Sequence, residues 1–389
     1  MEPLCGGQIK AKGASMTLST LKMSRRIRRT PFTDKVEWHG VTGFTVVNHT
    51  LLPKSFKNSV EEDYWHLREK VQIWDVGCQR QVQISGPDAK KLVQWITPRD
   101  LSNATPGKCF YVPLVTENGG FINDPVLLKL SENKFWLSIA DSDVLLWVRG
   151  LALGAKLNVD INEPDIWPLA IQGPKAVHVM SEVFGPNVRN IKFFNFDWFD
   201  FEDSKQLIAR SGYSKQGGFE IYLQGSKYGS RLWEKIYEAG IKYDIRPGSP
   251  NIIERVEGGL LSYGNEMTIE DNPLECGLDK YCNLSNKINF IGKKSLQAIA
   301  AKGLNKQIRG VRFEGEPMQA CSIPWPITSK TTRKAVGKIT SGIYSPRLKV
   351  NIGLSMIQKN YWDPGTEVCV HPDNGKIING TICNLPFEN

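Results

Sequence analysis

Short apolar stretches alternate with polar turns along most of the chain, and the kind of alternation changes near residue 304. Before that point, stretches in which every second residue is apolar are mixed with stretches at helical spacing, which predicts strands interleaved with helices. Strands are expected at 134–142, 206–214 and 218–224, and a helix at 230–240 that ends on Gly240 in the left-handed conformation. Beyond residue 304 the hairpin patterns predict a small all-β barrel or sandwich domain over 305–389.

One pattern occurs twice in the first of these regions. An apolar strand, a Gly-Pro turn and a helix are predicted for 81–100 (QVQISGPDAKKLVQWITPRD), and the same order returns at 169–184 (LAIQGPKAVHVMSEVF). In both copies the proline falls in the first helical turn, where its missing N–H costs nothing. The repeat predicts two similar βα units, and therefore an α+β region of mixed sheets and helices over 24–304.

Composition and charge exclude several classes of function. Hydrophobic residues make up 41% and charged residues 23% of the chain, as in globular proteins. No apolar run approaches the roughly 18 residues that cross a bilayer, so we expect no membrane partner. The net charge is +9, but the first 30 residues hold seven basic residues against Glu2, and the remainder is near-neutral. We therefore expect no nucleic-acid partner, and residues 1–23 are predicted to be a disordered leader or an appended segment.

The eight cysteines and five histidines are scattered without the spacing of metal ligands. We therefore expect no metal, and reduced thiols in a cytoplasmic protein that acts as a monomer or homodimer on a small molecule. A helix is expected over 251–261. The acids that follow it, Glu266, Glu270 and Asp271, match no calcium-binding loop and are interpreted as a solvated turn.

The segment SGYSKQGGFEIY (211–222) contains a predicted strand with two chemically different faces. At a period of two, Glu220 and Tyr222 point to one side, and Phe219 and Ile221 point to the other. A carboxylate accepts two parallel N–H bonds, which suits the edge of an aminopyrimidinone ring such as a pterin or guanine. The glycine pair before the strand would let such a flat ligand approach the backbone. The alternative is a half-exposed strand on which Glu220 is solvated.

The segment ENGGFINDP (117–125) places Asn123 and Asp124 in a glycine-containing turn. Either an Asx side chain caps the turn, which is a common arrangement, or the two polar groups face a ligand. Tyr111, in the segment KCFYVPL, likewise fits either a buried tyrosine or a ligand contact. The residues alone leave these alternatives open.

Several motifs, taken in order, resemble one protein family. The motifs are IWDVGCQRQVQISGPDA, GKCFYVPLVTENGGFINDP, LAIQGPKA, RSGYSKQGGFEIY, ERVEGGLLSYGNEM, FIGKKSL and ITSGIYSP. Over roughly residues 30 to 385 the chain resembles the tetrahydrofolate-dependent aminomethyltransferases, the T-proteins of the glycine cleavage system. The resemblance implies a bipartite folate-binding region around a central channel, a C-terminal β-domain and tetrahydrofolate as co-substrate. It also implies that Glu220 and Tyr222 contact the folate, while Tyr111, Asp124 and Tyr213 line its site.

The chain departs from the glycine cleavage enzymes at two places. They carry GG-x-x-D-D, whose first aspartate is catalytic, and Asn123 stands in its place here, while Asp124 matches the second. They also carry an arginine matching positions 250–251, which this chain lacks, although Arg255 is retained. The segments EEDYWHL, INDP and ECGLDKYC resemble instead a branch that demethylates dimethylsulfoniopropionate.

The chemistry of a sulfonium donor explains an amide at this place. Aminomethyl transfer needs a carboxylate to handle protons and a cationic carbon, whereas a sulfonium that loses a methyl group leaves as a neutral thioether. We therefore expect S-methyl transfer to N5 of tetrahydrofolate, giving 5-methyltetrahydrofolate, with Asn123 and Asp124 as catalytic residues. Tyr213 and Trp198 are expected to hold the sulfonium by cation-π contacts of roughly 0.5 to 2 kcal/mol. The open alternatives are demethylation of a methylated amine, aminomethyl transfer, and folate binding without catalysis.

Overall fold

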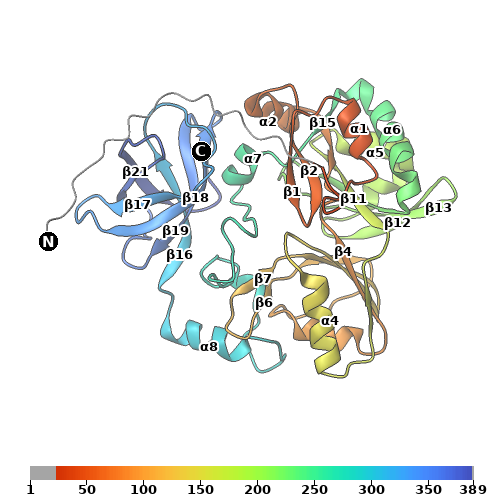
Figure 1. The fold of residues 1–389 in the computed structure, drawn as a ribbon, viewed down its shortest axis with the longest axis horizontal. Helices are drawn as coiled ribbons and strands as arrows, with labels where there is room; N and C mark the ends of the chain where they lie inside the picture. The colour runs from red at the N-terminus through yellow and green to blue at the C-terminus, as the bar shows by residue number, and fades with distance from the viewer. Residues whose placement is uncertain (1–22, 388–389) are drawn as a thin grey trace, which may run out of the picture.

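The computed structural model describes residues 23–387, so the leader expected over 1–23 lies almost wholly outside the described residues. Three parts surround a central stretch that contains the short helix α7 (Ile252–Glu257), as Figure 1 shows. Two parts are each built on a sheet and precede α7 in the chain for the most part, and the third is a C-terminal barrel. The expected α+β architecture with a C-terminal β-domain is confirmed.

The larger sheet has six strands and is covered by helices on one face. Neighbouring strands are antiparallel except β15 and β3, which run parallel. Helices α1 (Thr33–Trp38), α5 (Ala176–Phe184) and α6 (Gly229–Gly240) pack on this face through a core that includes Ile73, Ile221 and Trp233. The strands in spatial order are β12 (Phe196–Phe201), β13 (Ser204–Ala209), β14 (Gly218–Gln224), β11 (Ile166–Gln172), β3 (Val71–Asp75) and β15 (Ile245–Gly248). Beside β3 and β15 lie a hairpin of β1 (Gly43–Val47) and β2 (Thr50–Ser55), and α2 (Val60–Glu69).

The smaller sheet has five strands, and its two faces have different neighbours. Helices α3 (Ala89–Trp95) and α4 (Val144–Gly154) cover the outer face. On the inner face, Cys109 and Trp136 pack against Leu207 and Tyr222 of the larger sheet. The strands in spatial order are β10 (Asp160–Asn162), β4 (Gln81–Ser85), β9 (Lys134–Ser138), β8 (Val126–Ser131) and β5 (Lys108–Tyr111), and β6 (Leu114–Val115) pairs separately with β7 (Phe121–Asn123).

The repeated strand, Gly-Pro turn and helix are both formed. Gly86 follows β4 with φ of 117°, and Gly173 follows β11 with φ of 114°. In each copy the carbonyl of this glycine accepts a hydrogen bond from the alanine that begins the helix, Ala89 at 3.1 Å and Ala176 at 3.0 Å. The prediction of two similar βα units is confirmed, with one unit in each sheet.

The C-terminal part is a closed barrel rather than a sandwich, filled by side chains such as Val311, Ile327 and Val368. Helix α8 (Lys293–Lys302) leads into its first strand. The strands follow one another around the barrel as β16 (Lys306–Phe313), β19 (Val350–Gln358), β18 (Ala335–Ser345), β17 (Trp325–Ser329), β20 (Glu367–Val370) and β21 (Ile378–Cys383). Single 3-10 turns are η1 (Pro186–Asn190), η2 (Ser226–Tyr228), η3 (Ile241–Tyr243) and η4 (Asp279–Tyr281).

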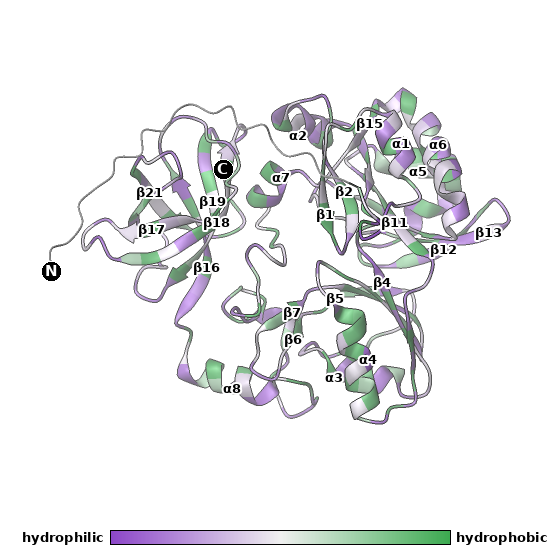
Figure 2. Ribbon diagram, in the orientation of Figure 1, coloured by the Kyte–Doolittle hydropathy of each residue, from purple (hydrophilic) through white to green (hydrophobic). Residues whose placement is uncertain are grey.

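Hydrophobic residues are spread over all three parts, and α4 is among the most hydrophobic helices (Figure 2). Leu146 and Leu153 of α4 remain exposed on its outer side. The helix has only 11 residues, and within residues 23–387 no helix is both long and apolar enough to cross a membrane.

Two helix ends differ from the sequence-based expectations. Gly240 has φ of −83° rather than a positive value, because the chain continues into η3 and the left-handed residue is Asp244, with φ of 59°. Glycine is required there for packing instead, since a Cβ would lie 2.6 Å from Cβ of Ile245. The helix expected over 251–261 ends at Glu257, where Gly258 and Gly259 follow.

Candidate active site

Helix α7 carries buried charged side chains that connect it to other parts of the protein. The side chain of Asn251 caps its first turn by accepting hydrogen bonds from two backbone N–H groups. Arg255 also donates a hydrogen bond to the hydroxyl of Ser341 in the barrel strand β18. The charged pairs are Glu254 with Arg68 of α2 at 2.9 Å, Arg255 with Glu266 at 2.8 Å, and Glu257 with Arg347 after β18 at 2.8 Å. The helix therefore ties the barrel to the N-terminal parts.

Tyr111 and Asp124 meet where the smaller sheet faces this central stretch. Tyr111 ends β5 and Asp124 follows β7, and the tyrosine hydroxyl donates to Asp124 Oδ2 at 3.0 Å. Asp124 Oδ1 is shielded from solvent and has no hydrogen-bond partner among the described residues. Burial raises the pKa of Asp124 to about 7, against the hydrogen bond from Tyr111. The site therefore holds an acceptor that a ligand with an N–H or O–H group would satisfy.

Tyr213 lies close to the same carboxylate. Its hydroxyl donates to the carbonyl oxygen of Leu261 at 2.6 Å. Burial raises the pKa of Tyr213, the charge of Arg255 opposes this rise, and the charges of Glu266 and Asp124 add to it. Tyr213 thus remains a neutral phenol, and its contacts join the Tyr111–Asp124 pair to the buried Arg255–Glu266 ion pair.

Glu220 and Tyr222 occupy the inner face of β14, opposite Phe219 and Ile221, so the predicted alternation is confirmed. Glu220 is only 7% exposed, which contradicts the alternative of a solvated side chain. The hydroxyl of Ser211 donates to it, and burial raises the pKa of the Glu220 carboxyl. Tyr222 is buried against Trp136 of the smaller sheet, with ring centroids 6.3 Å apart.

Gly212 and Gly218, the first residue of β14, serve the protein's own packing. A Cβ on Gly218 would lie 2.4 Å from the carbonyl oxygen of Ile171, and a Cβ on Gly212 would lie 2.0 Å from Gln172 Oε1. A Cβ on Gly217 would meet nothing within 4 Å, so room for a flat ligand beside this glycine pair stays a prediction. The second glycine of the segment 117–125 has a similar role, because a Cβ on Gly120 would lie 2.0 Å from the carbonyl oxygen of Ile269.

Asn123 is fully buried, and both polar atoms of its amide are used inside the protein. Its Nδ2 donates to the Ser142 hydroxyl at 2.8 Å, and its Oδ1 accepts from the backbone N–H of Ala140 at 3.0 Å. These bonds tie β7 to the loop that follows β9. Asn123 therefore has a structural role, and its expected catalytic role stays a prediction.

Trp198 lies on β12, the outermost strand of the larger sheet, two strands away from Tyr222. The residue is 37% exposed, and its ring packs edge-on against Trp136, with centroids 6.2 Å apart. The structure therefore does not bring Trp198 to Tyr213, with which it was expected to share a substrate. Trp198 covers the rim of the layer between the two sheets, and its role in holding the donor stays a prediction.

Two charged residues that interact with Arg255 were missed or misinterpreted from the sequence. Glu266 is 2% exposed and paired with Arg255, so its assignment to a solvated turn is wrong. Lys54 of β2 is exposed as a residue, yet desolvation of its ammonium, followed by the charge of Arg255, lowers its pKa. No spacing in the sequence marks these contacts, since Glu266 also accepts from Ser341, 75 positions later, and Lys54 and Arg255 are 201 positions apart.

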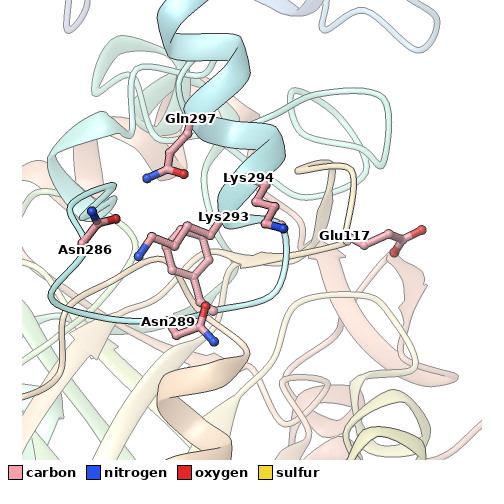
Figure 3. Close-up of a pocket in the computed structure, with 8 residues that line it drawn as sticks. Glu117, Asn286, Asn289, Lys293, Lys294 and Gln297 are labelled. Carbon is pink, nitrogen blue, oxygen red and sulfur yellow. The ribbon is translucent and has the colours of Figure 1, made fainter.

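Two pockets lie outside this group of residues. One, of about 450 Å³, is formed at the start of α8, where Lys293, Lys294 and Gln297 lie near Asn286 and Asn289 (Figure 3). The other, of about 700 Å³, lies between the end of α8 and the barrel and includes Lys306, which is 2.6 Å from Asp271. Within residues 23–387, no cluster of three or more His, Cys, Asp and Glu side chains could hold a metal ion.

Comparisons with known proteins cover nearly the whole chain. The family described as the GCVT N-terminal domain matches residues 30–286, and the glycine cleavage T-protein C-terminal barrel domain matches residues 306–388. The dimethylsulfoniopropionate demethylase of Ruegeria pomeroyi is 46% identical over 358 residues, which are 92% of this chain and 97% of that protein.

Aminomethyltransferases are less similar to the chain. The enzyme of Thermoanaerobacter pseudethanolicus is 30% identical over 82% of this chain and 86% of its own length, and that of Bacillus subtilis is 29% identical over 93% and 99%. The crystal structure of glycine cleavage system aminomethyltransferase T from Bartonella henselae superposes with a TM-score of 0.82 at 23% identity, over 93% of this chain and 98% of that one. The Bartonella henselae enzyme therefore has the same fold as this chain.

Proposed function

The chain belongs to the glycine cleavage T-protein family, and from this membership we propose that it transfers a methyl group from dimethylsulfoniopropionate to tetrahydrofolate. The products are 5-methyltetrahydrofolate and 3-methylthiopropionate. Identity of 46% to a demethylase of this donor, against 30% or less for the two aminomethyltransferases compared above, supports the choice of reaction. Both sets of relatives are matched over most of their length.

The single observation that carries the proposal is the unpartnered Oδ1 of Asp124 beside Tyr111. A reduced pterin presents N–H groups that suit such an acceptor, and the buried Glu220 is a second acceptor for them. The residues present therefore fit tetrahydrofolate, with Tyr111, Asp124, Tyr213, Glu220 and Tyr222 proposed to hold it. Tetrahydrofolate supplies the nucleophilic N5 that receives the methyl group.

The protein's contribution to this reaction is placement and exclusion of water. Tyr111 fixes the Asp124 carboxyl through its hydroxyl, so Oδ1 is presented in one orientation. Tyr213 is fixed by Leu261 and keeps its phenol neutral, which leaves a ring face for the sulfonium. A neutral thioether needs no proton when it leaves, so alignment of donor and acceptor is the main requirement.

The donor is a zwitterion, and its carboxylate needs a cation near Tyr213. We propose Lys54 for this role. Its charge lies close enough to Arg255 for that charge to lower the Lys54 pKa, and Arg255 itself is already paired with Glu266. A carboxylate beside Lys54 would relieve the repulsion between the two cations.

Mass spectrometry of the folate product tests the proposal. Purified protein with tetrahydrofolate should give 5-methyltetrahydrofolate from dimethylsulfoniopropionate and none from dimethylglycine. The matched variant Lys54→Gln should raise the KM for dimethylsulfoniopropionate without changing the KM for tetrahydrofolate. Formation of 5,10-methylenetetrahydrofolate, or turnover of dimethylglycine alone, would move the assignment to the second candidate, a folate enzyme of amines, which the aminomethyltransferase relatives favour.

We also propose that the protein works in a reducing compartment, the cytoplasm. All seven cysteines among the described residues are free thiols, and Cys78, Cys109, Cys276 and Cys369 are buried. Whether it acts as a monomer or a homodimer stays a prediction.

A further inference from the structure

Helix α4 has an apolar face that remains exposed in the described structure (Figures 1 and 2). Its buried side, which includes Val144, Val148 and Ala152, packs on the smaller sheet. On the other side, Leu146 is 64% exposed and Leu153 is 82% exposed, the largest exposed fraction of any large apolar residue within 23–387. Seven positions separate the two leucines, so they lie on one line along the helix. Exposed apolar faces of this kind are typical of binding surfaces.

Two glycines extend the same face. Gly150 follows Leu146 by four residues and precedes Leu153 by three, and Gly154 ends the helix. A Cβ on either glycine would meet nothing within 4 Å. Inside a helix, glycine is less favourable than alanine because it loses more backbone entropy on folding. Packing within one chain gives no reason for Gly150, whereas a second helix could approach its backbone closely there.

The charges at the two ends of this face are of opposite sign. Asp143 immediately precedes α4 and Lys156 follows it, and both residues are exposed. Neither forms an ion pair within residues 23–387. The only charged side chain inside the helix, Arg149, is occupied elsewhere, because its Nε and Nη2 donate to the carbonyl oxygen of Ile161 in β10 at 2.9 and 2.7 Å.

The face is complementary to itself. The two leucines and the two terminal charges share one midpoint in the chain, between residues 149 and 150. When two α4 helices pack antiparallel about that midpoint, Leu146 of one copy lies opposite Leu153 of the other. The same register places Asp143 opposite Lys156 at both ends. A contact between identical surfaces about a twofold axis requires this kind of self-complementarity.

We propose that the α4 face formed by Leu146, Gly150, Leu153 and Gly154 binds the same face of a second copy of this chain. A single pair of helices buries less area than the roughly 1,200 Å² at which standard interfaces begin, so we expect a weak dimer with a dissociation constant in the micromolar range. The inference is independent of the proposed reaction. Helix α4 covers the outer face of the smaller sheet, whereas Tyr222 packs on its inner face.

Sedimentation velocity of the full chain measures the association directly. From about 2 to 200 µM, a range that spans a micromolar dissociation constant, the parent protein should change from monomer to dimer. Leu153→Glu should remain monomeric over this range, because a dimer would bury two unpaired carboxylates in the apolar contact. The matched control is Ile241→Glu. It alters another exposed apolar residue, on η3 and 66% exposed, and should dimerise like the parent.

Exchange of the terminal charges tests the antiparallel register. Asp143→Lys and Lys156→Asp should each weaken self-association about tenfold, because like charges then meet at both ends of the contact. An equimolar mixture of the two variants should dimerise as tightly as the parent, since each lysine again lies opposite an aspartate. If neither variant weakens the dimer, or if mixing restores nothing, the proposed register is wrong.

Gly150→Ala separates the effect on the dimer from the effect on the fold. Its methyl group meets nothing within a single chain, so the urea midpoint of the monomer should rise. The same methyl group would hold the two helices apart and should weaken the dimer several-fold. A parent protein that stays monomeric at the highest concentration, or a dimer that persists in Leu153→Glu, would overturn the proposal. Binding of such a monomer to phosphatidylglycerol vesicles, lost in Leu153→Glu, would assign the face to a lipid surface instead.

Discussion

The side-chain amide of Asn123 donates a hydrogen bond to the hydroxyl of Ser142 at 2.8 Å, and that hydroxyl donates in turn to the carbonyl oxygen of Ile122 at 2.9 Å. The amide is thus the donor that the Ser142 oxygen requires, because its single proton is already given to Ile122. A carboxylate at position 123 would face that oxygen without a donor. The amide therefore has a structural reason that is independent of the reaction.

Asn123→Asp should therefore destabilise the protein. The Ser142 hydroxyl can donate to the new carboxylate or to Ile122 but not to both, and a fully buried charge is added. We expect a loss of about 1 to 3 kcal/mol in the free energy of unfolding, measured by urea denaturation at pH 7. When Asn123→Asp is made in a protein that already carries Ser142→Ala, it should change the free energy of unfolding by a different amount, because the effects of interacting residues do not add. Unchanged stability together with lost methyl transfer would contradict this prediction and support the catalytic role of Asn123.

Asp124 should make the stability of the protein depend on pH. Its pKa is raised from 3.8 to about 7 in the folded state, so between these values the unfolded chain has lost a proton that the folded one keeps. Asp124 therefore contributes a constant amount to the free energy of unfolding below about pH 4. This contribution decreases as the pH rises toward 7 and does not change at higher pH.

Asp124→Asn removes this titration. The variant should be more stable than the parent at pH 8 by about 1 to 3 kcal/mol, less than the full pKa difference represents because part of the side chain meets solvent. Near pH 4 the two proteins should be equally stable. Thermal unfolding across this pH range checks the prediction, and parallel curves for the two proteins would contradict it. Folate binding should weaken in the variant, since an acceptor is replaced in part by a donor.

The buried pair of Arg255 and Glu266 should be far more sensitive to single than to double substitution. Arg255→Met leaves Glu266 buried without its cation, and we expect it to lose about 3 to 5 kcal/mol of stability. Adding Glu266→Gln should recover part of this loss, because the amide can still bond to Ser341 and to the N–H of Ser262. Chemical denaturation of the two variants gives the comparison. If the double variant were less stable than Arg255→Met, the buried charge of Glu266 would not be the cause of the loss.

Trp198 and Tyr213 should differ in their effect on the methyl donor. Trp198→Ala removes a ring at the sheet edge, so the KM for the donor should change by less than about twofold, whereas loss of a cation-π contact in Tyr213→Ala corresponds to about 2- to 30-fold. Tyr213→Phe keeps the ring and serves as the control. Steady-state kinetics with saturating tetrahydrofolate measure both. A large effect of Trp198→Ala on this KM would contradict this prediction and support a place for Trp198 in the donor site.

Local patterns predicted the elements of this fold better than their long-range contacts. The Gly-Pro repeat and the alternation at Glu220 and Tyr222 depend on neighbouring residues, so the sequence was sufficient to place them. The burial of Glu266 depends on Ser341, 75 positions later, as well as on Arg255, and the crowding of Gly218 depends on Gln172, 46 positions earlier in the chain. Pairing between distant segments leaves no trace in the spacing of a single sequence. The structural role of Asn123 was missed for this reason, since its amide bonds to Ala140 and Ser142.

The charged side chains of α7 also set an order in which the protein can mature. Arg255 bonds to Ser341, 86 positions later, and Glu257 is paired with Arg347, 90 positions later. At about 5 to 20 residues per second, a ribosome needs roughly 4 to 18 seconds to add this stretch. During that time Arg255 can pair only with Glu266, 11 positions later, and Glu257 lacks its arginine. The nascent chain can therefore complete the contacts between α7 and the barrel only after the segment that ends at Arg347 has emerged.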